Sequence, residues 1–339
     1  MTAVCRNSRT VTVDDGTVTV KGWIQDTRNL GGISFVILRD RFGTIQLTLP
    51  KKKIDPELFA KITTLARESV VAVTGEVKPS NQTELGLEII PSDIEVYSEA
   101  ATPLPMGVID KVNVEMDTRL NNRFMDLRKP EIKAIFELKS IMVRLIVEAM
   151  NDNGFTQVYT PKIGASGAEG GATLFNVDYF GKKAYLAQSP QLYKQMLMSS
   201  GLDRVFELGP AFRAEQSNTN RHVTEFISFD GEMSWISCEE DVMHTIETII
   251  DYVLKGLAER GKEQLKVLGK EINIPATPYP ILTYEECLKI VNDGGLPLKN
   301  GDDLGTEGEK IVGVKQFDVI LIQFSSVQSL SRVRLFATP

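Results

Sequence analysis

Charged side chains gather in one short stretch of the chain, VFELGPAFRAEQSNTNRHVTEF, at residues 205–226. Two strand-like runs flank a polar turn, a pattern that predicts a β-hairpin. Arg213 is suited to holding a phosphate through two parallel hydrogen bonds, and Glu215 to accepting from an exocyclic amine. Arg221 and His222 follow on the same hairpin, where they could hold further phosphate oxygens. The alternative is a solvated charged hairpin, and these residues alone do not separate the two.

A second group of polar residues lies in AEGGATLF and QSPQLYKQM, at residues 168–175 and 188–196. The paired glycines allow close backbone approach, and Glu169 beside them could receive a ligand ammonium group. Gln191 and Lys194 are three residues apart, so a helix would place them on one face. An ammonium group fixed there is suited to a small carboxylate ligand. The alternative is an ordinary exposed helix face.

The composition limits the class of protein. With 339 residues, 42% hydrophobic and 24% charged, the chain predicts two globular domains with sizeable cores. The net charge of −7 argues against nonspecific nucleic-acid binding, although one local surface could still bind RNA. No apolar run reaches the ~18–20 residues of a membrane span, and no secretion signal is present. Three cysteines without metal-like or paired spacing indicate a reducing, cytosolic compartment.

The first domain is expected to be all-β. Between residues 17 and 97, five β-branched, alternating runs are bounded by turn residues, and one helix, Pro56–Arg67, follows the third run. This is the plan of an OB-fold barrel, which binds oligonucleotides; another small all-β domain is the alternative. The five runs are TVTVKGWI, ISFVILRD, GTIQLTL, SVVAVTGEV and LEIIPSDIEVY.

The period of the apolar residues changes in the second half of the chain. Residues 99–130 are rich in proline and predict a linker and hinge. Apolar residues at three- and four-residue steps then predict an amphipathic helix over 131–153. The members of this stripe are Ile135, Leu138, Met142, Leu145 and Ala149. Strand-like runs and the helices Pro190–Ser199 and Glu239–Arg260 follow, so the second domain is expected to be α+β with a largely antiparallel sheet.

Together these segments resemble the aspartyl-tRNA synthetases of the archaeal and eukaryotic cytosolic type, which are class II aminoacyl-tRNA synthetases. The resemblance runs from about Thr17 to about Gly313. It implies an OB-fold barrel followed by an α+β catalytic domain, an antiparallel sheet with flanking helices that is incomplete at its C-terminal end. The matching segments are GWIQDTRNLGGISFVILRD, DTRLNNRFMDLR, GFTQVYTPKI, EGGATLF, YLAQSPQLYKQM and FELGPAFRAEQSNTNRHVTEF.

The resemblance implies that the chain activates L-aspartate with ATP and passes it to tRNA(Asp). Arg213 would be the catalytic residue and hold the α-phosphate, where negative charge develops. Glu215 would read the adenine amino group, and Arg221 with His222 the distal phosphates. The family also uses Mg²⁺, whose acidic ligands are expected outside this chain.

The aspartate pocket would comprise Glu169, Gln191, Lys194 and Arg213, with Glu169 on the substrate ammonium group. Lys194 separates relatives of different specificity. An asparaginyl enzyme, the alternative within the family, reads a neutral amide and has no use for a facing cation. A lysyl enzyme requires acidic groups facing its substrate, and the sequence shows no such pattern.

In the first domain, the resemblance implies an anticodon-binding surface. Phe35 matches the aromatic residue on which an anticodon base stacks. Gln46 matches a residue that reads a base edge, and Arg28 lies in the loop that faces the RNA. The alternative for Phe35 is a place in the barrel core.

The expected organisation is an OB-fold domain at 1–101, a hinge at 102–130, a partial catalytic domain at 131–313 and a tail unrelated to the family at 314–339. The third signature of class II enzymes is not found, and Gly231 replaces a branched residue on a core strand. The alternative to a ligase is therefore a tRNA-binding fragment without catalysis. A cytoplasmic homodimer is expected, formed through residues 131–161, where Pro161 ends the first class II signature.

Overall fold

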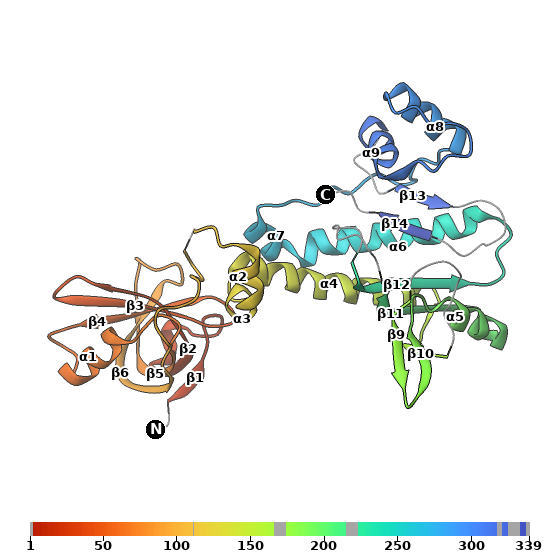
Figure 1. The fold of residues 1–339 in the computed structure, drawn as a ribbon. Helices are drawn as coiled ribbons and strands as arrows, with labels where there is room; N and C mark the ends of the chain where they lie inside the picture. The colour runs from red at the N-terminus through yellow and green to blue at the C-terminus, as the bar shows by residue number, and fades with distance from the viewer. Residues whose placement is uncertain are drawn as a thin grey trace. The chain divides into compact units, whose positions relative to one another are not determined.

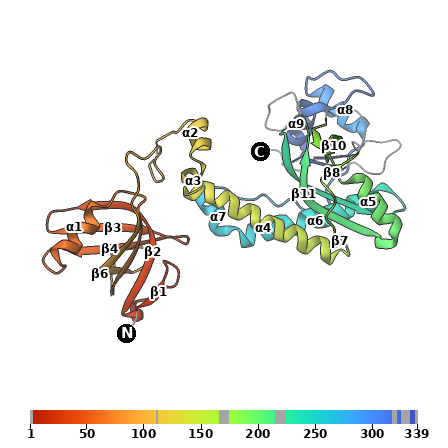
Figure 2. The ribbon, with the colours of Figure 1, turned by 60° about the horizontal axis from the view of Figure 1, so that its bottom comes forward.

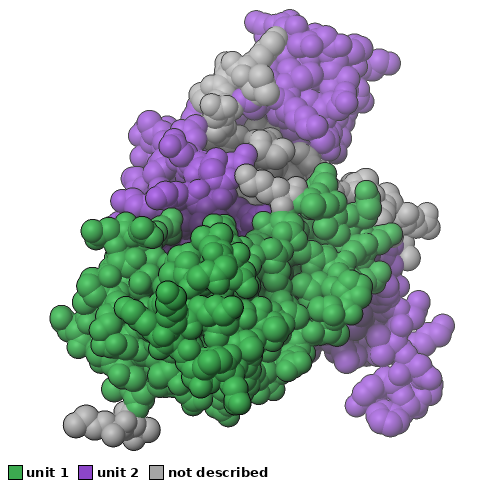
Figure 3. All heavy atoms as spheres, turned by 90° about the vertical axis from the view of Figure 1, so that its left-hand side faces the viewer, with its two compact units in different colours: residues 1–129 green, residues 130–339 purple. Residues whose placement is uncertain are grey.

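The computed structural model of the chain describes residues 3–110, 112–165, 174–214, 223–316, 321–324 and 333–336. The chain divides into two compact units, residues 1–129 and 130–339, which are coloured separately in Figure 3. Figure 1 follows the chain through both units by colour. In the described ranges, no helix has the length and apolar composition needed to cross a bilayer.

The first unit contains a closed β-barrel. Its sheet has the order β1-β2-β3-β4-β6-β5, and β2 also pairs with β5, which closes the sheet on itself. A bulge between Ile24 and Asp26 bends the long strand β2, so that it pairs with β5 along its first half and with β3 along its second. The strands are β1 (Val4–Arg6), β2 (Thr17–Asn29), β3 (Ile33–Arg39), β4 (Thr44–Pro50), β5 (Val70–Pro79) and β6 (Leu87–Ser98).

Alternation along these strands fills the barrel. In β3, for example, the side chains of Val36 and Leu38 are buried in the core, whereas that of Phe35, which precedes Val36, is only half-buried. The helix α1 (Pro56–Thr64) begins where the Asp55 carboxylate accepts hydrogen bonds from two backbone amides. The predicted OB-fold is confirmed, with three differences. The helix ends three residues early, the parallel strand β1 was not predicted, and a short 3₁₀ turn, η1 (Val13–Asp15), precedes β2.

Residues 102–129, here called the connector, were expected to form a linker and hinge. They contain two short helices, α2 (Met116–Asn121) and α3 (Arg123–Asp126). Met106, Val108 and Met125 form a small apolar cluster of their own. The connector therefore has folded structure, and the division between the two units falls after it.

The second unit is built on two long helices, α4 (Pro130–Asp152) and α6 (Glu239–Arg260), which lie side by side in both ribbon views (Figures 1 and 2). The shorter α7 (Lys262–Leu268) follows α6. Their shared core holds Leu145, Met150, Phe206, Ile249 and Val253.

The amphipathic helix was predicted correctly, but its buried stripe was only partly right. Leu145 and Ala149 are buried, whereas Ile135 and Met142 remain exposed. The buried face of α4 instead includes Ala134, Ile141 and Met150, because it turns toward α6 and the sheet. An apolar period of 3.6 residues predicts that one face of a helix is apolar, but it does not predict which residues of that face are buried by neighbouring elements.

The second unit also contains two small sheets. One has the order β12-β11-β7, with β11 antiparallel to β12 and parallel to β7; the other is antiparallel, with the order β8-β10-β9. The expected strand over residues 155–163 is broken into β7 and β8, because Pro161 lacks an N–H and the Thr160 amide bonds a side chain instead. The elements are β7 (Thr156–Gln157), β8 (Ile163–Gly164), β9 (Asn176–Tyr179), β10 (Lys182–Leu186), α5 (Gln191–Leu197), the π-type turn η2 (Met198–Leu202), β11 (Arg204–Phe212) and β12 (Glu225–Met233).

The last part of the chain forms a separate small cluster. The helices α8 (Tyr284–Asp293) and α9 (Gly305–Gln316) enclose Cys287, Val291, Leu304 and Val312. The backbone of β13 (Leu321–Phe324) pairs with that of β14 (Val333–Phe336). The helix α9 continues across residue 313, where the family resemblance was expected to end.

Candidate functional site

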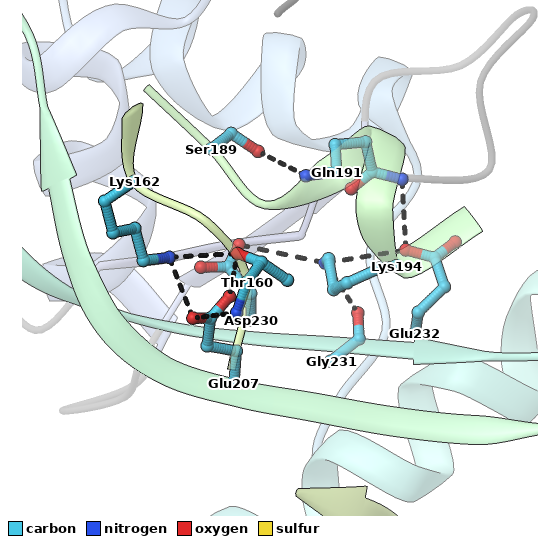
Figure 4. A network of polar contacts seen from close by, with 9 residues as sticks. All are labelled: Thr160, Lys162, Ser189, Gln191, Lys194, Glu207, Asp230, Gly231 and Glu232. Carbon is cyan, nitrogen blue, oxygen red and sulfur yellow. Dashed lines mark hydrogen bonds and ion pairs between the residues drawn. The ribbon is translucent and has the colours of Figure 1, made fainter. Parts of the chain in front are cut away.

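Lys194 is the most deeply buried cation in the part of the chain that the structure describes, with 2% of its surface exposed. It lies on α5, and its Nζ donates to the carbonyl oxygen of Gly231 at 3.2 Å. Carboxylate oxygens of Glu232 and Asp230 lie 3.5 Å and 3.9 Å from Nζ. Figure 4 shows the ammonium group of Lys194 among Asp230, Gly231 and Glu232, which all belong to β12. Two carboxylates and a carbonyl compensate the burial of the charge.

Gln191 lies one helical turn before Lys194 and is also buried. Its Nε2 donates to Glu232 at 3.0 Å, which fixes the amide and turns its carbonyl oxygen away from the carboxylate. Gln188, on the segment before the helix, is buried, and its Nε2 has no acceptor among the described residues. A buried donor without a partner is expected where a ligand completes the site. The predicted face is therefore inside the protein, not exposed to solvent.

Arg213 follows the end of β11. The amide of Phe212, the preceding residue, donates to the carbonyl oxygen of Ala187 at 3.0 Å. This bond sets the strand end that carries Arg213 against the segment that carries Gln188. The Arg213 guanidinium lies 5.4 Å from the centre of the Phe226 ring, on the opposite strand. Arginine stacked on an aromatic ring keeps its N–H groups available for a phosphate.

Glu207 holds the segment around Pro161 in place, and the sequence did not single it out. It is buried in β11 and accepts from the Thr160 amide at 3.0 Å and the Thr160 hydroxyl at 2.7 Å. Lys162 Nζ lies 2.8 Å from the same carboxylate (Figure 4). The available signal was a glutamate inside the apolar run VFELGPAF. Asp230 and Glu232 were missed for a different reason, since they lie on a strand that was read only as sheet.

Four of the predicted site residues lie outside the described residues: Glu169, Glu215, Arg221 and His222. The hairpin that was predicted to carry three of them is present, because β11 and β12 pair in antiparallel register from Arg204 opposite Met233 to Phe212 opposite Glu225.

The three predicted RNA-facing residues lie together on the outer face of the barrel. Phe35 is opposite Arg28 on β2 and opposite Thr48 on β4, and Gln46 is two residues from Thr48. Phe35 does not belong to the apolar core of the barrel, to which its neighbour Val36 belongs. Its ring therefore lies beside an exposed arginine on the surface.

Glu88 was not predicted to belong to this face. Its carboxylate accepts from the Thr48 hydroxyl at 2.8 Å and from Gln46 Nε2 at 3.3 Å. The bond sets the direction of the Gln46 amide, so that a base read by Gln46 would meet the carbonyl oxygen. Only pairing across strands far apart in sequence brings Glu88 to this place.

The structure combines an OB-fold barrel with an α+β unit that contains a buried lysine and an arginine beside an aromatic ring. The comparisons with known proteins identify the family that has this combination. Residues 18–97 match the family of OB-fold nucleic acid binding domains, and residues 115–328 match the class II tRNA synthetases (D, K and N). The second match extends past residue 313.

The chain is similar to the aspartate–tRNA(Asp) ligase of Pyrococcus abyssi, with 49% identity over 87% of this chain and 68% of the relative. It is 48% identical to the aspartate–tRNA(Asp/Asn) ligase of Methanocorpusculum labreanum, over 90% of this chain and 71% of the relative. The chain belongs to the family of class II tRNA synthetases (D, K and N).

Solved structures of the family have the same fold. The asparaginyl-tRNA synthetase from Pyrococcus horikoshii, complexed with asparaginyl-adenylate, matches with a TM-score of 0.80 and 30% identity, covering 88% of this chain and 69% of that one. The aspartyl-tRNA synthetase from Entamoeba histolytica matches with a TM-score of 0.74 and 30% identity, covering 89% and 66%.

Proposed function

We propose that the chain is an aspartate–tRNA ligase. In the first step, an oxygen of the α-carboxylate of L-aspartate attacks the α-phosphorus of ATP, and pyrophosphate leaves to give aspartyl-adenylate. In the second step, the terminal ribose hydroxyl of tRNA(Asp) attacks the aspartyl carbonyl carbon, and AMP leaves. The relatives named as aspartate–tRNA ligases support this reaction, and the observation that carries the choice of aspartate is the buried Lys194.

Lys194 suits a negatively charged substrate side chain. Of its three N–H donors, the structure assigns one to the Gly231 carbonyl oxygen. The carboxylates of Asp230 and Glu232 hold the ammonium group at ion-pair distance, so the cation is placed before the substrate arrives. A fixed cation that is already desolvated attracts a carboxylate more strongly than one that must first leave water.

The carboxylates of Asp230 and Glu232 are also relevant to whether the chain could activate lysine instead of aspartate. Acidic groups do lie beside the proposed pocket, contrary to the expectation from sequence, but both are paired with Lys194. A substrate ammonium group would have to displace an internal lysine to reach them. The pairing with Lys194 therefore argues against a lysyl enzyme.

The remaining residues are assigned by resemblance and by position. Arg213 would hold the α-phosphate, where charge develops, and its place at the end of β11 supports this. Glu215 would bind adenine, Arg221 and His222 the distal phosphates, and Glu169 the substrate ammonium group.

Mg²⁺ is expected in the family reaction, where it neutralises phosphate charge. Within the described ranges, no three Asp, Glu, His or Cys side chains come together in a way that would hold a metal ion. The described residues therefore do not fit the ion.

The barrel would bind the anticodon of tRNA(Asp) through Arg28, Phe35 and Gln46. A half-buried ring flanked by an exposed guanidinium is the arrangement on which an unstacked base rests. We also propose a cytoplasmic homodimer formed through residues 131–161. The exposed Ile135 and Met142 on α4 support a second copy there, and the three free cysteines support a reducing compartment.

Pyrophosphate exchange tests the amino-acid specificity. The full chain is incubated with ATP, labelled pyrophosphate and, separately, aspartate, asparagine or lysine. Exchange that depends on aspartate is expected. Exchange with asparagine in preference to aspartate would make the chain an asparaginyl enzyme, and exchange with none would leave a tRNA-binding protein, which titration with tRNA(Asp) would then detect.

A further inference from the structure

The segment DTRLNNRFMDLR, residues 117–128, resembles the family, yet the proposed reaction gives it no role. It forms the C-terminal part of the connector. Its last residue, Arg128, reaches the barrel. Arg128 Nη1 donates to the Glu68 carboxylate at 2.7 Å, and its guanidinium lies 5.2 Å from the centre of the Trp23 ring.

Glu68 receives a second arginine. Arg39, on β3, donates from one nitrogen to both carboxylate oxygens of Glu68, at 3.0 Å and 2.7 Å, and also lies beside Trp23 at 5.9 Å. Both Arg39 and Glu68 are buried. One carboxylate and one indole ring are thus shared between a barrel arginine and a connector arginine. Charge-assisted bonds of this kind are stronger and more directional than neutral ones.

The backbone at Glu68 is held in an unfavourable conformation. Its φ is 70°, in the left-handed region that residues other than glycine rarely adopt. Its amide donates to the carbonyl oxygen of Ile24 at 2.7 Å, which fixes it to β2. Strain of this kind persists only where the surroundings enforce it, and it often marks a residue with a task.

Contacts within the connector hold the residues before Arg128 in a folded structure. Asp126 is fully buried and is paired with Arg119 and Arg123, and Met125 beside it is packed against Met106. Arg128 therefore extends from a folded base rather than from a free loop. The residue after next is Pro130, where α4 begins.

We propose that Arg128 is a positioning residue for the tRNA-dependent step. By binding Glu68 and stacking on Trp23, it fixes the connector to the barrel, so that barrel and connector move as one body. The RNA-binding barrel is then joined to α4 by a short peptide rather than by a long flexible tether. If the whole connector, residues 102–129, were a flexible tether, the effective concentration of barrel-bound tRNA at the catalytic unit would be lower. The tRNA part of this inference rests on the proposed function.

The anchor can be measured without any activity. Trp23 and Trp235 are the two tryptophans of the chain, and Trp235 is 87% exposed. In a Trp235→Phe background of the full chain, Trp23 is the single reporter. Arg128→Met should make Trp23 more accessible to acrylamide and increase chymotrypsin cleavage within residues 102–129 about tenfold, the effect of losing one charge-assisted hydrogen bond. Lys129→Met is the matched control, because it removes the next charge and leaves the Glu68 and Trp23 contacts.

The same proteins then test the role in catalysis. Arg128→Met should lower kcat/KM for tRNA about tenfold while aspartate-dependent pyrophosphate exchange changes by less than about twofold, because the residues of the proposed amino-acid site belong to the second unit and are unchanged. Arg128→Lys keeps the charge but loses the planar stacking on Trp23, so it should restore the tRNA step only in part.

Each alternative result is informative. If Arg128→Met matches Lys129→Met in quenching and cleavage, the anchor does not exist. If the connector loosens but kcat/KM for tRNA is unchanged, the positioning role is wrong. If the parent protein shows no exchange, the proposed function fails, and quenching and cleavage still decide whether Arg128 anchors the connector.

Discussion

At the scale of the residue, the proposed selection of aspartate depends on the buried Lys194. Lys194→Met should lower kcat/KM for aspartate in pyrophosphate exchange about 100-fold, because truncating one member of a buried charge pair costs about 3 kcal/mol. The KM for ATP should change little, since ATP is proposed to bind through Arg213 and the hairpin.

The control is Lys183→Met on β10, an exposed lysine in the same unit. An unchanged KM for aspartate in Lys194→Met would remove Lys194 from the pocket. A variant that fails to fold is recognised by far-UV circular dichroism, in which case Lys194→Arg, which keeps the charge but not the shape, provides the comparison.

Phe35 should contribute to RNA binding alone. Phe35→Ala is expected to weaken binding of tRNA(Asp) by about 1–3 kcal/mol, the usual value of one base stacked on an aromatic ring. Aspartyl-adenylate formation should not change. Filter-binding titration measures the affinity, with exposed Phe42, on the turn between β3 and β4, as the control position. Equal affinities would show that the ring does not touch RNA.

The sequence identified side chains whose chemistry is explicit, and it missed those that act by holding others. Lys194 and Gln191 were predicted from type and spacing, and Phe35 from the family resemblance. The structure places the first two inside the protein and Phe35 on the barrel surface. Glu207, Glu232 and Glu88 were missed because each meets a partner that is far away in the sequence. No local pattern specifies a pairing over 40 or more residues.

At the scale of the element, β12 contains a glycine that its backbone does not require. A Cβ on Gly231 would lie 3.4 Å from Met150 Cε, which is ordinary contact with a flexible side chain, and Gly231 has no positive φ. Gly231→Ala should therefore stabilise the second unit by about 0.5–1 kcal/mol, by reducing the entropy of the unfolded chain.

Urea denaturation followed by circular dichroism measures this gain. Exchange activity should persist, because Lys194 contacts the carbonyl oxygen of residue 231 and not a side chain. Gly181→Ala on the hairpin between β9 and β10 is a control of opposite sign, since its φ of 77° disfavours a Cβ. A less stable Gly231→Ala protein would show that the strand is more tightly packed than the structure indicates.

The connector should lose stability in acid. A hydrogen bond from Arg119 holds the pKa of Asp126 below its usual value, opposed by burial, and the charges of Arg119 and Arg123 add to the effect. Because the pKa is lower in the folded state, the stabilisation is complete above the unfolded value of about 3.9 and is lost as the pH falls through the folded pKa.

Asp126→Asn removes this contribution at every pH. The difference between the parent and Asp126→Asn in Trp23 accessibility should therefore be largest near neutral pH and shrink below about pH 4. Asp117→Asn, an exposed carboxylate of the same segment, is the control. A difference that stays constant down to pH 3 would contradict the assignment.

Helices and strands were predicted well where local sequence signals were strong, and poorly where tertiary contacts determine the structure. The helix Glu239–Arg260 was predicted with the bounds that α6 has, and the barrel strands β2 to β6 lie where alternation placed them, although β2 is longer than expected and β1 was not predicted. The connector was read as a hinge because its prolines and sparse apolar residues hide a core made of only a few side chains. Its order depends on contacts such as Arg128 with Glu68, which pattern does not reveal.

At the scale of the whole molecule, the two units have separate cores. In the first unit, the core of the barrel lies within residues 11–96 and that of the connector within 104–125, whereas the main core of the second unit lies within 141–257. The first unit should therefore fold when residues 1–129 are expressed alone. The residues proposed to bind the anticodon, Arg28, Phe35 and Gln46, are all contained in it, so this fragment should bind tRNA(Asp) without catalysing exchange.

A shorter fragment, residues 1–101, tests where the unit ends. It keeps the barrel core but loses Arg128, which leaves Glu68 with one arginine in place of two and uncovers one face of Trp23. Residues 1–129 should therefore unfold at higher urea concentration, with a difference of about 1.5–3 kcal/mol from the lost charge-assisted bond. Affinity for tRNA(Asp) should be the same for both fragments, because the RNA-facing strands are unchanged. Equal stability would mean that the connector adds nothing to the barrel, and the boundary of the first unit would then lie near residue 101.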